Sequence, residues 1–299
     1  MTLASCDSRK TAGENPFFTE WDTPHGVPPF DKILPEHFMP AFERGMSLHE
    51  AEIDAITSNK DEATFENTIL AYDDAGQMLA QTELVFGMLC AAETNDRMQA
   101  LQEQAMPLLA AHRDKIRLDD KLFVRVKEVY DRRAALGLDA EQMRLLQKTY
   151  DSFVRAGALL DAEQKARLKE INGQLSLTAV KFGNNILAEN NNFVLELKSD
   201  ELDGLPAGIR DAAREKAQQM GKGDKWVFTL HKPSLIPLLT YSTRRDLREK
   251  IYKAYLNRCN NGDEYDNKQL INDFIRLRTE KAHLLGYPSY AAYVVADEM

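Results

Sequence analysis

The feature that most constrains the fold of this 299-residue chain is a helical spacing of apolar residues through most of its length. From Pro35 onward, apolar side chains recur every three or four positions for about 155 residues, as on one face of a helix. The spacing returns at Pro233 and continues to the end. Residues typical of helix ends divide the first stretch. After a first helix that carries Phe38, Phe42 and Met46 on one face, we predict helices at 69–89, 98–116, 122–135, 142–159 and 161–188.

Two short apolar runs interrupt this spacing and are typical of strands. Residues 193–197 (FVLEL) and 226–230 (WVFTL) combine β-branched and aromatic side chains. They enclose a short helical segment at 207–220, and the asparagines at 190–192 are expected to end the preceding helix. We predict that the two strands pair as one ribbon. The fold class is therefore mainly α, a multi-helix domain with one small two-stranded β insertion.

The domain organisation follows from the same pattern. Residues 1–14 are polar and lack periodicity, and residues 15–299 form the helical domain, with a subdivision near residue 190 left open. Prolines block helix formation in 15–34. We expect that segment to be extended and to pack over the surface through Phe17, Phe18, Trp21 and Phe30.

Composition narrows the range of partners. The net charge of −9 argues against nucleic-acid binding, which requires clustered Lys and Arg. The 43% hydrophobic and 28% charged residues are typical of a soluble globular protein. No run approaches the roughly 20 apolar residues of a membrane-spanning helix, so we expect no transmembrane segment.

The three cysteines have different surroundings. Cys90 lies in an apolar run and is expected to be a buried structural thiol, whereas Cys259 is near a polar turn without an obvious partner. Leu3-Ala4-Ser5-Cys6 resembles a bacterial lipobox, although the charged and apolar regions of a signal peptide are missing. Lipidation at Cys6 predicts a periplasmic or membrane-tethered lipoprotein. The alternatives are a disordered natural terminus and a cytoplasmic location.

The histidines do not form a zinc-peptidase motif. Such a site needs two histidines one helical turn apart, with a glutamate between them as the base and a third ligand from a distant acid. No two of the six lie within four positions of each other: they are His25, His37, His49, His112, His231 and His283. We expect His37 to be an exposed or half-buried first-turn residue. The sequence predicts no catalytic residue, no metal ligand and no bound zinc in this chain.

One segment is a candidate for ligand contact. Tyr241, Arg244 and Arg245 stand close together at a helix start, where they could meet a peptide backbone or a C-terminal carboxylate. The simpler interpretation, which we favour, is a helix cap followed by surface arginines. The acidic pairs Asp61-Glu62 and Asp73-Asp74 are likewise typical of caps and surface charge.

Several segments resemble one enzyme family. Residues 277–287 (LRTEKAHLLGY) are similar to the "LRxExAxLLGY" segment of the oligopeptidase family of zinc metallopeptidases, which includes thimet oligopeptidase, oligopeptidase A and the bacterial peptidyl-dipeptidases. Residues 15–18, 28–33 and 36–42 resemble the start of peptidyl-dipeptidase chains, and 64–69 (TFENTI) fits next in order. The resemblance spans roughly Asn15 to Met299 and covers only the half that precedes the family's zinc site.

The resemblance implies a specific role. The chain would be the amino-terminal, channel-wall part of a zinc-dependent peptidyl-dipeptidase that acts on short peptides. Its carboxy-terminal catalytic half, the partner that holds the HExxH motif and the zinc ion, would lie beyond Met299. The alternatives are an endo-acting oligopeptidase of the same family and a non-catalytic helical binding or scaffold protein. We also expect 266–299 to be less stable here than in a longer parent protein, because its apolar residues cover more than one helix face.

Overall fold

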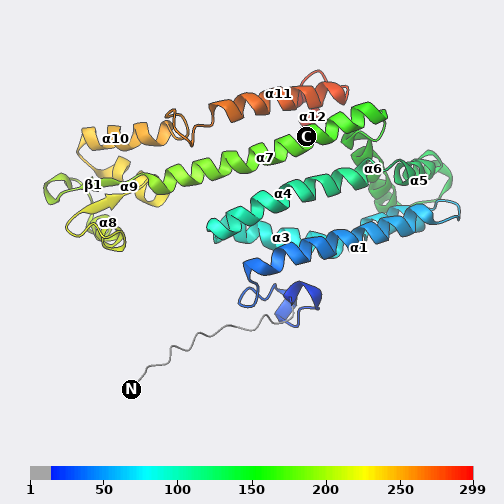
Figure 1. Cartoon of the computed structure of the whole chain (residues 1–299), viewed down its shortest axis with the longest axis horizontal. Coiled ribbons are helices and arrows are strands. Elements are labelled where there is room, and N and C mark those ends of the chain that lie inside the picture. Colours follow the sequence, from blue (N-terminus) through cyan, green and yellow to red (C-terminus); the bar gives the residue numbers. More distant parts are fainter. Residues whose placement is uncertain (1–14, 299) are drawn as a thin grey trace. The chain divides into compact units, whose positions relative to one another are not determined.

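The structure, a computed structural model, describes residues 15–298 and divides into two compact units (Figure 1). Of the described residues, 15–177 and 278–298 belong to unit 1, and Thr178–Leu277 form unit 2. Helices dominate both units, and the only sheet among the described residues is a two-stranded ribbon in unit 2. The predicted fold class is confirmed.

Apart from the helix predicted at 69–89, the helices of unit 1 follow the predicted segments closely. They are α1 (Phe38–Ser58), α2 (Ala71–Asp73), α3 (Gln77–Ala92), α4 (Asp96–Arg117), α5 (Asp120–Asp131), α6 (Ala140–Ala156) and α12 (Tyr290–Val295). Two helices, α7 (Ala162–Asn192) and α11 (Lys268–Leu284), contribute residues to both units. None of the helices described in 15–298 is long and apolar enough to cross a membrane.

A first core lies where α1, α3 and α4 meet. Phe38 and Phe42 of α1 contact Phe86 of α3 edge to face, with ring centroids 4.9 and 5.3 Å apart. The segment 15–34 packs here through Phe17, as predicted, but it forms short 3₁₀ turns at Pro16–Phe18 and Pro24–Gly26 instead of extended chain. Phe30, also predicted to pack, is 43% exposed.

A second core in unit 1 joins α5 and α6 to the turn at Phe65–Leu70. Phe123 and Phe153 are buried within it. At its edge, the rings of Tyr130 and Tyr150 stack face to face with centroids 3.8 Å apart, and the guanidinium of Arg133 lies 4.0 Å from the Tyr130 centroid. The cation offsets the repulsion that two stacked π faces otherwise feel.

The helix predicted at 69–89 is broken. A π-helical turn at Phe65–Leu70 leads through the short α2 to Gly76, which has φ +77° and precedes α3. The positive φ favours glycine, and a Cβ at Gly76 would also crowd Nδ1 of His49 at 2.9 Å. The apolar spacing continues across the break, which is why the pattern indicated one helix. Leu84, one of the apolar residues whose spacing suggested a single long helix, is 68% exposed.

Unit 2 is built around the ribbon. Strand β1 (Leu195–Leu197) pairs antiparallel with β2 (Trp226–Phe228), with Leu195 opposite Phe228. Both strands are shorter than predicted, and α7 runs through Asn190 and Asn191 and ends at Asn192, the last of the three asparagines predicted to end it. The other helices are α8 (Ala207–Gln219), α9 (Lys232–Tyr241) and α10 (Arg245–Leu256). Side chains of the ribbon, α9 and α10 form the core.

The segment that suggested the family forms α11 and α12. Gly286 has φ +81°, and the N–H of Tyr287 donates to the carbonyl of Ala282, so Gly286 forms the C-cap of α11. Ser289 caps α12 by accepting from the N–H of Ala292. The apolar residues of α11 are not all covered: Ala282 is buried, but Ile271 and Ile275 are 46% and 61% exposed.

Candidate functional site

The three candidate ligand-contact residues lie where α9 gives way to α10. Tyr241 ends α9 and is half exposed, Arg244 precedes α10, and Arg245 is its exposed first residue. Of the three, only Arg244 lines a hollow in unit 2. That hollow has a volume of about 750 Å³ and is formed mainly by the turn 199–206, with Arg210 from α8.

A glycine turn brings this hollow and the start of α10 together. A Cβ at Gly204 would lie 2.2 Å from the carbonyl oxygen of Tyr241, so only glycine permits the approach. Asp203 then bonds Thr243 twice: its carbonyl accepts from the backbone N–H at 3.1 Å, and its carboxylate accepts from Oγ1 at 2.6 Å.

The hollow carries both signs of charge. Asp200 and Asp203 supply carboxylates, and Arg210 and Arg244 supply guanidinium groups. Arg244 also donates to Asp246 at 3.0 and 2.7 Å, and this bond lowers the pKa of the Asp246 carboxyl. A surface of this kind can hold a zwitterion, with a carboxylate on the arginines and an ammonium on the acids.

The six histidines differ in their exposure and contacts. His25, His231 and His283 are exposed. His37 is buried, contrary to the prediction, because its Nδ1 accepts the N–H of Leu34 and holds the turn before α1.

His49 of α1 and His112 of α4 are in contact with each other. Nε2 of His112 lies 3.0 Å from Nδ1 of His49, and Nδ1 of His112 lies 3.5 Å from a carboxylate oxygen of Glu50. Sequence reasoning missed this pair because 63 positions separate its members. A signal was present: His49 shares a helix face with Ile53 and Ile56, and His112 shares one with Leu109 and Ile116.

The described residues do not fit a catalytic zinc ion. Across 15–298, no three His, Cys, Asp or Glu side chains are arranged to hold a metal. The facing nitrogens of His49 and His112 are already in hydrogen-bond contact with each other. We therefore assign no zinc-dependent step to residues of this part of the chain.

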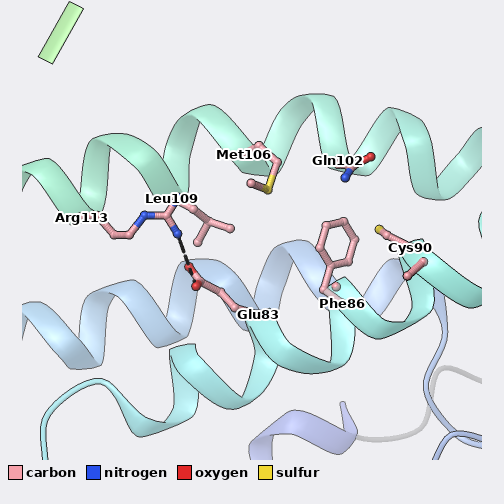
Figure 2. Close-up of a pocket in the computed structure, with 9 residues that line it drawn as sticks. Glu83, Phe86, Cys90, Gln102, Met106, Leu109 and Arg113 are labelled. Atoms are coloured by element: carbon pink, nitrogen blue, oxygen red, sulfur yellow. Dashed lines mark hydrogen bonds and ion pairs between the residues drawn. The ribbon is translucent and has the colours of Figure 1, made fainter. Parts of the chain in front are cut away.

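A pocket of about 370 Å³ lies between α3 and α4 (Figure 2). Phe86, Met106 and Leu109 give it apolar walls. Arg113 of α4 reaches across to Glu83 of α3, and their charged groups are 3.3 Å apart.

The cysteines differ from expectation in part. Cys90 lines the α3/α4 pocket and is half buried instead of fully buried, and burial raises the pKa of its thiol. Cys259 is buried at φ +56°, where burial, with the nearby Glu189 carboxylate, raises its pKa to about 11. Cys6 lies outside the described residues.

Comparison with known proteins gives a consistent result. A model of Peptidase family M3 matches residues 238–299. The dipeptidyl carboxypeptidase of Escherichia coli K12 is 37% identical over 286 residues, which cover 95% of this chain and 42% of the relative. The chain belongs to peptidase family M3.

More distant M3 relatives match nearly the whole chain. Oligopeptidase A of Escherichia coli K12 is 27% identical over 93% of this chain and 41% of the relative. The organellar oligopeptidase A of Arabidopsis thaliana is 27% identical over 99% of this chain and 38% of the relative. The predicted family resemblance is thereby confirmed. The M3 chain spans less than half the length of these curated relatives.

Proposed function

We propose that this chain is the amino-terminal, channel-wall part of a zinc-dependent peptidyl-dipeptidase that removes C-terminal dipeptides from short peptides. The observation that best supports the proposal is that the chain's sequence identity to a dipeptidyl carboxypeptidase relative exceeds its identity to an oligopeptidase relative. Over nearly the same length, the chain is 37% identical to a dipeptidyl carboxypeptidase and 27% identical to oligopeptidase A of one bacterial strain. An endo-acting oligopeptidase is the alternative that the second relative supports.

The chemistry belongs to polypeptide outside this chain. A catalytic half with an HExxH motif would hold zinc and supply the glutamate that activates the zinc-bound water. The present chain would enclose the peptide. This division is supported by the 42% share of the relative's length that the chain covers and by the poor fit of the described residues to a zinc site.

Two measurements test the proposal. The gene downstream of codon 299 is sequenced, and the continuous product is assayed on peptides blocked at the N-terminus. We expect an in-frame HExxH motif, release of dipeptides from free C-termini, and no cleavage of the matched C-terminal amides. Equal cleavage of the amides at internal bonds would favour the endo-acting alternative, and an open reading frame that ends without the motif would overturn the proposal.

The chain by itself is expected to be inactive and to bind no stoichiometric zinc. Its histidines lack the i, i+4 spacing that aims two imidazoles at one ion. Metal analysis of the purified, tag-free protein checks this expectation. About one tightly held zinc ion per chain, a level typical of a structural or catalytic site, would contradict it.

Within the longer enzyme, we propose that Arg244 helps to hold the peptide's carboxylate in the hollow of unit 2. The Arg244→Ala variant should raise KM for peptides with a free C-terminus several-fold and change KM for their amides little. Arg245→Ala is the matched control, because Arg245 is exposed and does not line the hollow. Equal effects of the two substitutions would contradict this role, and Tyr241 would then be tested in the same way.

We also propose that Cys6 is the lipidation site of a periplasmic or membrane-tethered lipoprotein. The proposal is supported by the small residues that precede Cys6 in the sequence. Expression from the natural gene in a Gram-negative host with labelled fatty acid should mark the protein, and Cys6→Ser should abolish the label. An unlabelled protein in the cytoplasmic fraction would support the cytoplasmic alternative.

A further inference from the structure

The contact between His49 and His112 joins two long helices through two imidazole rings. Their facing nitrogens are 3.0 Å apart, and the ring centroids are 5.0 Å apart. The side chain of His112 is only 3% exposed, and His49 is half buried. Two nitrogens at this distance share one hydrogen, so one ring must donate and the other must accept.

The turn before α3 packs against one ring of the pair. The Gly76 turn approaches His49 so closely that a Cβ there would lie 2.9 Å from Nδ1. The backbone N–H of Gly76 donates to Glu52 at 2.7 Å, which fixes this turn against α1. The charged groups that act on the pair are Glu50 and Glu52 from α1, and Arg113 and Lys115 from α4.

The geometry limits how many protons the pair can hold. With one proton added to His112, Nδ1 donates to Glu50 and Nε2 donates to His49, so the contact persists. A second proton on His49 would set two N–H donors face to face and bring two positive rings together. Lys115 already engages Glu50 at 2.8 Å, so this carboxylate is shared and compensates the second charge poorly.

We propose that the His49–His112 pair is a proton-sensitive contact that holds α4 against α1 near neutral pH and releases it on acidification. The release would act on the pocket between α3 and α4. Arg113, the neighbour of His112, forms the ion pair with Glu83 at that pocket (Figure 2). Loosening α4 would therefore open the pocket and expose Cys90, which lines it. The inference rests on unit 1 alone and is independent of the proposed peptidase function.

The pKa values of both histidines are shifted in the direction that release on acidification requires. Burial lowers the pKa of His49, and the nearby His112 lowers it further, against the opposing effect of Glu52 and Glu50. Burial also lowers the pKa of His112, with Glu50 opposing. The pKa of a histidine in the unfolded chain is near 6.5. When folding lowers that pKa, the neutral ring stabilises the fold at pH values above about 6.5. That stabilisation is lost as the pH falls through the folded pKa.

Accessibility of Cys90 tests the proposal in the 299-residue chain. A pyridyl disulfide, which reacts with thiols in acid, is added at about pH 7.5 and about pH 5, on either side of the ordinary histidine pKa. Labelling of Cys90 is located by peptide mass spectrometry and divided by the rate for the urea-unfolded chain at the same pH. We expect this ratio to rise several-fold on acidification.

The His49→Asn variant removes one titrating ring and retains a polar atom near the position of Nδ1. On acidification, the Cys90 labelling ratio of this variant should rise by less than half as much as that of the unsubstituted chain. His25→Asn removes an exposed imidazole and is the matched control, which should keep the full rise. Equal rises in the unsubstituted chain and His49→Asn, or no rise in either, would overturn the proposal.

A second measurement needs no substitution. Nuclear magnetic resonance of labelled histidine rings follows the protonation of both members in the natural chain. We expect at least one ring to stay neutral well below the ordinary histidine value of about 6.5. If both rings take up protons at or above that value while the contact persists, the proposal is wrong, whether or not His49→Asn folds.

Discussion

Single aromatic residues carry much of the stability of unit 1. Phe42 is 1% exposed and contacts both Phe38 and Phe86. Phe42→Ala should lower the free energy of unfolding by about 3–5 kcal/mol, because it removes buried area and leaves a cavity. Leu84→Ala, at a 68% exposed position of α3, should change it by less than about 0.5 kcal/mol. Urea unfolding followed by circular dichroism checks both values, and similar losses would contradict the assignment of Phe42 to the core.

Two glycines should respond to alanine in opposite directions. Gly157 ends α6 at φ +99°, and a Cβ there would lie 2.7 Å from Leu168. Gly157→Ala should therefore cost more than about 1 kcal/mol. Gly173 lies inside α7 with open space around it, so Gly173→Ala should stabilise the chain by about 0.5–1 kcal/mol. Thermal unfolding of the two variants tests the signs, and a stabilised Gly157→Ala would show that this turn is wrongly described.

At the scale of elements, the start of α6 is stabilised by a capping box that residues three positions apart form. Asp139 accepts the N–H of Gln142 at 2.9 Å, and the Gln142 side chain accepts the N–H of Asp139 at 3.1 Å. Asp139→Ala should cost about 1 kcal/mol, whereas Asp139→Asn should cost only a few tenths. Equal losses in chemical denaturation would mean that charge at this position, and not the cap bond, is what matters.

The helix starts were predictable because their signals are local. Asp139 and Ser289 each bond a backbone N–H three residues ahead, which a short stretch of sequence reveals. The break before α3 was not predictable, since it depends on Gly76 meeting His49 of a separate helix. The exposure of Ile275 was not predictable for a similar reason: spacing shows that a face is apolar, and only packing decides which part of it is covered.

The candidate site was predictable to a smaller extent. Arg244 was chosen from the sequence and does line a hollow, but its acidic neighbours Asp200 and Asp203 come from a turn that spacing could not place beside it. The absence of an HExxH motif from the 299 residues could be recognised in the sequence, because that motif depends on a fixed local spacing. The His49–His112 contact joins separate helices and became visible only in the fold.

At the scale of the whole molecule, each unit has a core of its own. Leu146 is fully buried in unit 1, and Leu197 is fully buried in unit 2. Substitution of either by alanine should cost about 2–5 kcal/mol. We expect Leu197→Ala to speed hydrogen exchange across 195–256 with little change across 38–58, and Leu146→Ala to do the reverse around 120–156. Exchange that accelerates uniformly through both units in either variant would show that the chain unfolds as one cooperative body.

The stacked tyrosines provide a spectroscopic signal that can distinguish unfolding of unit 1 from unfolding of unit 2. Two phenol rings stacked 3.8 Å apart couple their electronic transitions, so the Tyr130–Tyr150 pair should contribute a distinct near-ultraviolet circular dichroism band. The band belongs to unit 1, whereas Trp226 lies in the ribbon of unit 2. In a Trp21→Phe background, tryptophan emission would therefore report unit 2 while the tyrosine band reports unit 1. A single heating experiment could then resolve two melting events by wavelength.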